Sequence, residues 1–409
     1  MRNSTATLVV GTTADYIDWI ENRSRSRAIF LTAIHERHKA AERFAPPQRE
    51  LLTDLTRSEQ CIPFVQSYLR ATGVSLDGIA CFDDESLPLA AMLAQALALE
   101  FPSVKSILRS LDKQAAKEAW MASGVPCPKA IAVSGSLDEL DTGEICFPCV
   151  LKPHSASGSE RVFLCHTRAQ ARHAAIEIID SAENDTAVAE EYIVGEEFSC
   201  DFVIDDGHVQ ILRTARKHMA ATCPLGTALA YSLPSHLDEF LYEEILGEVL
   251  RNAATSLGIS RAICMVDFIV RDEEIFLIEL SPRMGGDCLP HVMLEAWGVD
   301  AIGRAMEFYR GESIGPWLNE SAPTVVGLRI FSQAAGKVSS VNTHEIDEDA
   351  RIISHTLKES SGRVVVMPPQ DYSSWLLGHV VFQPYAARDV EEQIRDFRER
   401  ISISLEDLK

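Results

Sequence analysis

One stretch constrains the fold of this chain more than any other, the segment MVDFIVRDEEIFLIELSPRMGGD from Met265 to Asp287. Its first six residues alternate apolar and polar side chains, four charged residues follow at 271–274, and IFLIEL is a second apolar run. Two strands joined by a short charged turn fit this pattern. The segment therefore predicts a β-hairpin.

Two acidic side chains in this hairpin are expected to converge. Asp267 is placed two residues into the first strand and Glu279 near the end of the second, so pairing can bring both to one face. Burying two carboxylates among apolar residues is costly unless a cation such as Mg²⁺ lies between them. Arg283 adds a fixed cation, and Gly285 and Gly286 let backbone N–H groups approach a ligand. The set predicts a site for a metal-bound phosphate; an exposed hairpin with solvated charges is the alternative.

The pattern D-F-I-V followed by I-E-L-x-P-R-x-G-G resembles the metal and phosphate signature of the ATP-grasp superfamily. Members of this family join a carboxylate to a nucleophile through an acyl phosphate. The resemblance implies that Asp267 and Glu279 bind Mg²⁺ or Mn²⁺, that Arg283 is the catalytic contact to phosphate, and that the two glycines bind substrate with it. Many relatives carry Asn where this chain has Ser281, so whether Ser281 contacts metal stays open.

The bulk properties fit an enzyme that binds small molecules. With 409 residues, 46% of them hydrophobic, the chain can form two or three domains. A net charge of −22 disfavours nucleic acid and anionic membranes as partners, whereas ATP needs only a few local cations. The sequence shows no apolar run long enough for a membrane span, and ten scattered cysteines suggest neither disulfides nor a zinc array. We expect a cytoplasmic protein with reduced cysteines, either a monomer or a homodimer.

The first segment, residues 1–103, alternates strands and helices. Apolar strands are expected at 7–12, 28–34 and 78–84, which predicts a parallel sheet with helices on both faces. The sequence GTTADY lacks the later glycines of a dinucleotide fingerprint. The family resemblance implies an N-terminal α/β domain that contributes one wall of the substrate site.

Residues 104–315 are expected to form the ATP-grasp core, with two α+β subdomains at about 104–188 and 189–315. One amphipathic helix is predicted from Val104 to Gly124. Within it, LDK followed by AWMASGVPCPKA resembles the family's entry into its first nucleotide-binding subdomain, which implies that Lys113 contacts the ATP phosphates. A solvated surface lysine is the alternative.

A second nucleotide motif is expected in FPCVLKPHSASGSERVFLC. A strand at 147–151 is followed by Lys152 and a run of small residues, whose backbone and hydroxyl groups can surround phosphate oxygens. The resemblance to the ATP-grasp lysine and phosphate lid implies that Lys152, Ser157 and Gly158 bind nucleotide, with a stiffer lid because it holds one glycine. A polar hairpin loop, or a redox site at the CxxC of residues 146–149, are the alternatives.

The sequence EEYIVGEE resembles the hinge that holds adenine and ribose in this family. A strand is expected over 190–193 and a bend at Gly195. The resemblance implies that the backbone at Glu190, Glu191 and Ile193 contacts adenine. It also implies that Glu197 accepts the ribose hydroxyls, which suits a carboxylate that can only accept. A plain acidic surface would have the same composition.

Residues 213–237 are expected to form a long loop, since Gly and Pro interrupt a basic stretch. Its cations could meet phosphate or a substrate carboxylate, or form a solvated patch; they are Arg213, Arg216, Lys217 and His218. A helix is expected over 237–254, and helical sequence returns after the hairpin, where His291 is expected to be structural.

The last segment, residues 316–409, is expected to be a small α+β domain. Short strands such as TVVGLRIFS, GKVSSVN, GRVVVMPPQ and GHVVFQPY precede a charged helix over 390–402. The segment resembles the C-terminal domain of the L-amino-acid ligases, a dipeptide-forming branch of the ATP-grasp superfamily.

The expected fold is therefore α/β and α+β multidomain, with an N-terminal parallel domain, an ATP-grasp core and a C-terminal α+β domain. The resemblance implies an ATP-dependent ligase that joins a small carboxylate to an amine and releases ADP and phosphate. A carboxylase or nucleotide-biosynthesis ligase that activates bicarbonate or formate is one alternative. A sensor that binds ATP without turnover is another.

Overall fold

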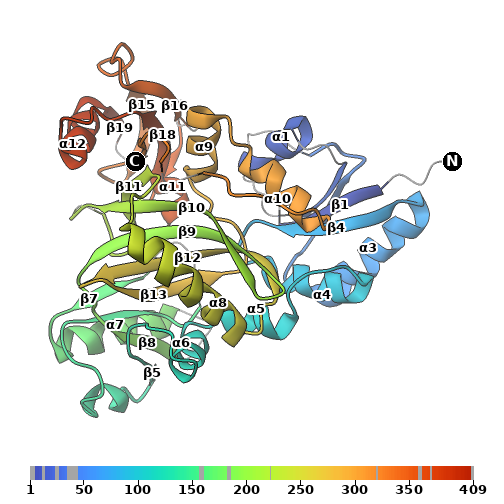
Figure 1. Cartoon of the computed structure of the whole chain (residues 1–409), viewed down its shortest axis with the longest axis horizontal. Helices are drawn as coiled ribbons and strands as arrows, with labels where there is room; N and C mark the ends of the chain where they lie inside the picture. The colour runs from blue at the N-terminus through green and yellow to red at the C-terminus, as the bar shows by residue number, and fades with distance from the viewer. Residues whose placement is uncertain are drawn as a thin grey trace.

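The protein is described by a computed structural model, shown whole in Figure 1. The described residues are 5–11, 14–23, 27–34, 45–155, 161–181, 186–221, 223–318, 321–357, 362–368 and 371–406. Strands within these ranges form four sheets, of four, four, eight and three strands. No helix in these ranges is long and apolar enough to cross a membrane.

The N-terminal sheet is parallel, with the strand order β3-β2-β1-β4. Its strands are β1 (Thr5–Val10), β2 (Ala28–Ala33), β3 (Glu50–Thr53) and β4 (Ser75–Cys81). Helices α1 (Ala14–Arg23) and α10 (Ala301–Tyr309) pack on one face, and α3 (Ser58–Thr72) and α4 (Leu87–Leu97) pack on the other. Alternate side chains divide accordingly, since Val9 joins the first core and Leu8 the second. The predicted parallel sheet with helices on both faces is confirmed.

The single helix predicted from Val104 to Gly124 is wrong in one respect, because the structure has two helices there. These are α5 (Val104–Leu111) and α6 (Lys113–Ala122). Asp112 separates them in an extended conformation, and its carboxylate accepts a hydrogen bond from the backbone N–H of Ala115. An N-cap of this kind starts a new helix. Lys113 is therefore the first residue of α6.

A small antiparallel sheet lies below the large sheet in Figure 1, with the order β5-β8-β6-β7 and helix α7 (Arg168–Ser181) packed on it. Its strands are β5 (Ala130–Ser134), β6 (Cys149–Pro153), β7 (Phe163–Cys165) and β8 (Thr186–Glu191); a 3₁₀ helix, η1, spans Asp138–Asp141. Lys152 was predicted to follow a strand, but it lies inside β6. The predicted lid residues Ser157 and Gly158 fall outside the described residues.

The large antiparallel sheet has the order β13-β12-β9-β10-β11-β14-β18-β16. Its first five strands are β13 (Glu274–Ser281), β12 (Arg261–Arg271), β9 (Glu196–Asp205), β10 (His208–Met219) and β11 (Ala228–Leu233). The predicted hairpin is β12–β13, and its turn residues Asp272 and Glu273 have positive φ angles of 51° and 64°, as two-residue turns of type I′ require. Asp267 lies in the middle of β12, not two residues into it.

Of two predictions next to this sheet, the loop is wrong and the helix is confirmed with its ends shifted by two residues. Much of the loop expected over 213–237 is the hairpin β10–β11, because its charged side chains find partners on the sheet and do not need solvent. The helix expected over 237–254 is present over 239–256, and it contains a π-helical turn at Leu241–Leu246 (η2) that continues as α8 (Gly247–Ser256).

The C-terminal strands do not all form a sheet of their own. Strands β14 (Val325–Phe331), β18 (Leu376–Phe382) and β16 (Ile352–Leu357) extend the large sheet from β11. A separate three-stranded sheet contains β17 (Val364–Val365), β15 (Gly336–Asn342) and β19 (Ser402–Glu406), with α11 (Tyr372–Trp375) and α12 (Val390–Arg400) nearby. The closing helix ends before the predicted residue 402, and β19 was not predicted. The domain limits at 103 and 315 stay predictions.

Candidate functional site

A cleft lies between the small sheet and the β12–β13 end of the large sheet. It is open to solvent on one side and is lined by both charged and apolar side chains, as small-molecule sites are. Eight of the predicted site residues line it: Lys113, Lys152, Glu190, Glu191, Ile193, Glu197, Asp267 and Glu279. The structure thus brings together residues that are far apart in the sequence, while their roles stay predictions.

One wall of the cleft carries a group of buried charges that we call the lysine cluster, formed by Lys113, Lys117, Lys152 and Glu190. Glu190, on β8, lies between two ammonium groups, 2.7 Å from Lys152 Nζ and 3.4 Å from Lys117 Nζ. Lys117 and Glu190 are almost fully buried. Three cations share one carboxylate, so the cluster has a net positive charge and suits an anionic ligand.

The pKa values of the cluster reflect burial opposed by pairing. Burial lowers the pKa of Lys117 to about 8, although Glu190 acts to raise it. Burial also lowers the pKa of Lys113, against the pull of Glu279. Burial alone would raise the pKa of Glu190, but the two lysines hold it below its ordinary value. Glu190 is therefore ionised and keeps the lysines close together.

The opposite wall carries the carboxylate cluster, formed by Asp267, Glu279, Glu197 and Lys217 on four adjacent strands. Asp267 and Glu279 are cross-strand partners, as predicted, which places their Cβ atoms about 4.5–5.5 Å apart. The register shifts directly after this pair, so Ile278 is an extra residue in β13. The bulge turns both Ile278 and Glu279 toward the cleft, and the Ile278 carbonyl accepts a hydrogen bond from Lys117 Nζ at 2.8 Å.

Lys217 neutralises part of the carboxylate cluster. Its Nζ donates to Asp267 Oδ2 at 2.7 Å and lies 3.4 Å from Glu197 Oε2. Burial alone would lower its pKa, but Asp267 and Glu197 raise it far above the ordinary value. Lys217 is thus paired with two of the three carboxylates, and the cluster as a whole keeps a net negative charge. Carboxylate oxygens that converge on a cleft with net negative charge fit the all-oxygen ligand set of Mg²⁺.

Arg283 lies away from the residues that line the cleft. Its Nε donates to Asp84 Oδ1 at 2.9 Å, and Asp84 also accepts from the Ser281 hydroxyl. Burial alone would lower the pKa of Arg283, but Asp84 raises it. Asp84 follows β4, so this contact joins the N-terminal domain to the loop after β13. The role of Arg283 at phosphate stays a prediction, and Ser281 contacts Asp84 in this structure.

The two glycines after Arg283 have a packing role that the sequence did not predict. The N–H of Gly285 donates to Asp201 Oδ1 at 2.8 Å, so it is engaged within the protein rather than presented to a ligand. A Cβ at Gly285 would lie 2.4 Å from the guanidinium of Arg213, which is fully buried against Asp201. Gly286 has more room, with Tyr16 Oη at 3.4 Å from such a Cβ.

The other basic residues of β10 are also paired. Arg216 contacts Glu196 on the surface, and His218 contacts Glu391 and Ser232. With Arg213 buried, only Lys217 among the four predicted cations of this stretch lines the cleft. These residues form neither the predicted substrate-binding patch nor a solvated basic patch. Side chains alternate between the two faces of β10, and each of the four cations pairs with a different acidic residue.

The hinge region lines the cleft next to apolar side chains that suit a base. Val150, Phe268 and Ile269 contribute to this part of the wall. The backbone N–H of Glu191 donates to the Lys129 carbonyl at 2.9 Å, so that group is already engaged. The carboxylate of Glu190 belongs to the lysine cluster. Adenine recognition by the hinge backbone stays a prediction.

The CxxC motif does not form a reactive dithiol. Cys146 is exposed and Cys149 is buried in β6, and all ten cysteines are free. Burial raises the pKa of Cys149 to about 12, which opposes thiolate chemistry. A redox site at this motif is not supported.

Two important residues were missed from the sequence, Lys117 and Asp84. Lys117 had a usable indication, because it lies four residues after Lys113 and so on the same helix face. Lys217 was named as a candidate cation, but its pairing with Asp267 was not predicted because its strand was expected to be a loop. Asp84 pairs with a residue 199 positions away, and no local pattern reports such a contact.

Comparison with known proteins finds one family over part of the chain. Residues 145–291, which include both metal-ligand candidates, match the family model described as the ATP-grasp domain. This segment therefore matches the ATP-grasp domain that the hairpin motif resembles. The L-amino acid ligase from Bacillus licheniformis has the same overall fold, with a TM-score of 0.80 over 100% of both chains at 18% sequence identity.

Two curated relatives match parts of the chain. Dapdiamide A synthase of Enterobacter agglomerans is 25% identical over 184 residues, or 42% of this chain and 42% of its own length. A D-alanine–D-alanine ligase of Francisella tularensis subsp. holarctica (strain LVS) is 27% identical over 202 residues, or 48% of this chain and 66% of its own length. The chain thus spans less than two thirds of either relative.

Proposed function

We propose that this protein is an ATP-dependent carboxylate–amine ligase that forms an amide bond between amino acids or similar small molecules. The observation that carries the proposal is the pair of oppositely charged clusters that face each other across one cleft. A cationic wall suits the phosphates of ATP, and a carboxylate wall suits the Mg²⁺ (or Mn²⁺) that accompanies them. The ligase names of the two relatives and of the L-amino acid ligase agree with this chemistry.

In the proposed reaction the γ-phosphoryl group of ATP passes to the substrate carboxylate and forms an acyl phosphate. The amine then attacks the acyl carbon, phosphate leaves, and the amide remains. Lys113 and Lys152 would balance the negative charge that builds on the phosphate oxygens, and Glu190 would keep Lys152 in position. Asp267 and Glu279 would hold the metal, which would neutralise part of the phosphate charge. This reaction requires no side-chain nucleophile.

The test is a screen of ADP release over pairs of amino acids in the presence of Mg²⁺, with mass spectrometry of the products. ADP release that requires two amino acids, together with a new amide product, supports the proposal. ADP release that requires bicarbonate or formate would replace it with the carboxylase or nucleotide-biosynthesis alternative. ATP binding without any ADP release would support the sensor.

A further inference from the structure

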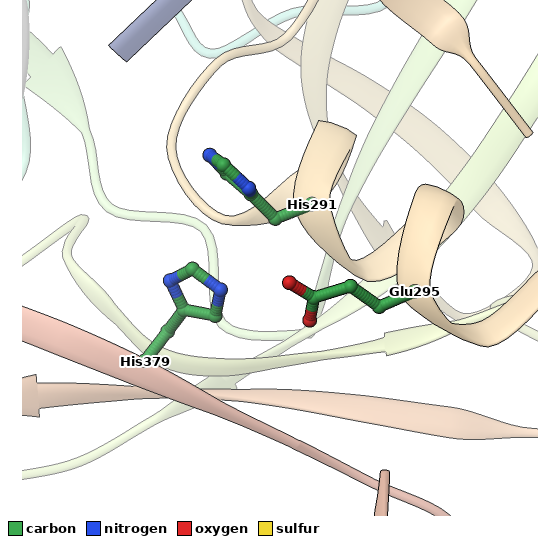
Figure 2. Close-up of side chains that lie close together, drawn as sticks. All are labelled: His291, Glu295 and His379. Atoms are coloured by element: carbon green, nitrogen blue, oxygen red, sulfur yellow. The ribbon is translucent and has the colours of Figure 1, made fainter. Parts of the chain in front are cut away.

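A second group of metal-ligating side chains lies outside the cleft, and Figure 2 shows how its members face one another. The group is His291, Glu295 and His379, which we call the histidine cluster. Their nearest ligand atoms, one from each residue, all lie within 4.8 Å of one another. None of the three residues lines the cleft described above.

The fold brings the three together from two elements. His291 and Glu295 are four residues apart on α9 (Leu289–Trp297), so they lie on the same helix face. His379 lies on β18, which packs against α9, and its backbone pairs with Arg329 on one side and Thr356 on the other. A side chain fixed by a central strand and two fixed by a helix form a rigid arrangement.

The surroundings orient the cluster. His379 is buried at 8% exposure, and the other two residues are partly buried. The His291 ring meets the edge of Trp19 at 5.0 Å and lies 5.1 Å from the His379 ring, measured between centroids. The Ser354 hydroxyl on β16 donates to Glu295 Oε2. A hydrogen bond that holds a ligating carboxylate in place is typical of metal sites.

Two imidazoles and one carboxylate are a ligand set that zinc takes in proteins, with a water in the fourth position. Bonds of about 2.0–2.1 Å in a tetrahedral arrangement put ligand atoms roughly 3.3 Å apart. The ligand atoms of the three residues, all within 4.8 Å of one another, lie near that spacing. Two neutral imidazole nitrogens also favour zinc over Mg²⁺, which prefers oxygen.

We propose that His291, Glu295 and His379 bind one zinc ion, which fastens α9 to the C-terminal strands. Helix α9 begins directly after the loop that contains Arg283, and β18 belongs to the C-terminal part of the large sheet. A metal bridge between them would couple the C-terminal strands to the loop that contains Arg283. This assignment is independent of the proposed ligase activity.

The experiment measures zinc bound per chain in protein freed of metal by a chelator, in excess Mg²⁺ so that the carboxylate cluster is occupied. We expect one zinc per wild-type chain and a zinc-dependent rise in melting temperature. His379→Ala and Glu295→Gln should weaken zinc affinity by at least ~100-fold, above the loss caused by removing a residue that only supports a ligand. His355→Ala, a partly exposed histidine on neighbouring β16, is the matched control and should leave zinc binding unchanged.

Cobalt substitution separates this site from the ten cysteines and does not depend on any variant. Co²⁺ in the histidine cluster should give visible ligand-field bands without the near-ultraviolet thiolate band that cysteine ligation produces. A thiolate band, zinc binding that is equal in wild type and Glu295→Gln, or no zinc bound by the wild type would each overturn the assignment.

Discussion

The two walls of the cleft carry opposite net charges. In the lysine cluster Glu190 pairs with two cations, Lys117 and Lys152, and in the carboxylate cluster Lys217 pairs with two carboxylates, Asp267 and Glu197. In each, a single opposite charge holds like charges close together in a partly or fully buried position. The comparison teaches that one residue of opposite charge, Glu190 or Lys217, holds the like charges of each wall in place. The net charge that remains on the wall can then attract a ligand of opposite charge.

The walls differ in how firmly their charges are buried. Lys117 and Glu190 are 1% and 3% exposed, whereas Asp267 and Glu197 are 18% and 23% exposed. A buried charge that loses its partner destabilises the protein more than an exposed one does, because water cannot replace the lost interaction. We therefore expect changes in the lysine cluster to affect folding as well as binding, and changes in the carboxylate cluster to affect mainly chemistry.

The largest expected effect is on turnover when the metal wall loses a ligand. Glu279→Gln should lower the rate of ADP release by at least ~10³-fold, since metal neutralisation of phosphate charge contributes several kcal/mol. The protein should remain folded, as circular dichroism would show. Glu274→Gln, an exposed change on the same strand, should keep the wild-type rate. A variant at position 279 with normal turnover would remove Glu279 from the metal site.

The next effect is on stability in the lysine wall. Glu190→Gln leaves two buried ammonium groups without their carboxylate and should lower the free energy of unfolding by about 3–5 kcal/mol. Chemical denaturation would measure the loss. Glu191→Gln, the exposed neighbour, should change it by less than ~0.5 kcal/mol. Equal effects at both positions would contradict the buried role of Glu190.

A smaller effect is expected on nucleotide affinity. Lys152→Ala should weaken ATP binding by roughly 1.5–3 kcal/mol, the range for a hydrogen bond to a charged group. Isothermal titration calorimetry would report it, with Lys105→Ala, an exposed lysine on α5, as the control. An unchanged dissociation constant for ATP would show that Lys152 pairs with Glu190 but does not bind ATP.

The smallest effect is on the pH dependence of stability. The pKa of Lys117 is about 8 in the folded protein and 10.5 without burial. Between these values the unfolded chain binds more protons at this site, so stability rises with pH. Wild type should gain up to ~2 kcal/mol over Lys117→Met from pH 8 to about pH 10. A constant difference between the two proteins over this range would mean that Lys117 titrates normally.

The hairpin was predictable because its information is local. Alternation and a short charged turn fix the register that pairs Asp267 with Glu279, and these lie within thirteen residues of each other. The parallel sheet was predictable for the same reason, since strands β1 and β2 each contain a short apolar run, LVV and AIFL.

The partners of the site residues were not predictable. Lys217 reaches Asp267 across 50 positions, and Arg283 reaches Asp84 across 199. Such pairs depend on which strands become neighbours, and no local periodicity contains that information. The basic stretch at 213–218 is an example: the Gly and Pro residues that follow it suggested a loop, although each of its charged side chains has a partner on a sheet.

The central claim is that the two walls bind different parts of one ligand, the lysine wall the phosphates and the carboxylate wall the metal. The most direct test is calorimetric titration of ATP with and without Mg²⁺ in wild type, Lys152→Ala and Glu279→Gln. The account predicts that Lys152→Ala weakens ATP binding by a similar factor in both conditions. It predicts that Glu279→Gln removes only the strengthening that Mg²⁺ gives to the wild type. If Mg²⁺ strengthens ATP binding equally in wild type and Glu279→Gln, the metal does not lie on the carboxylate wall and the account is wrong.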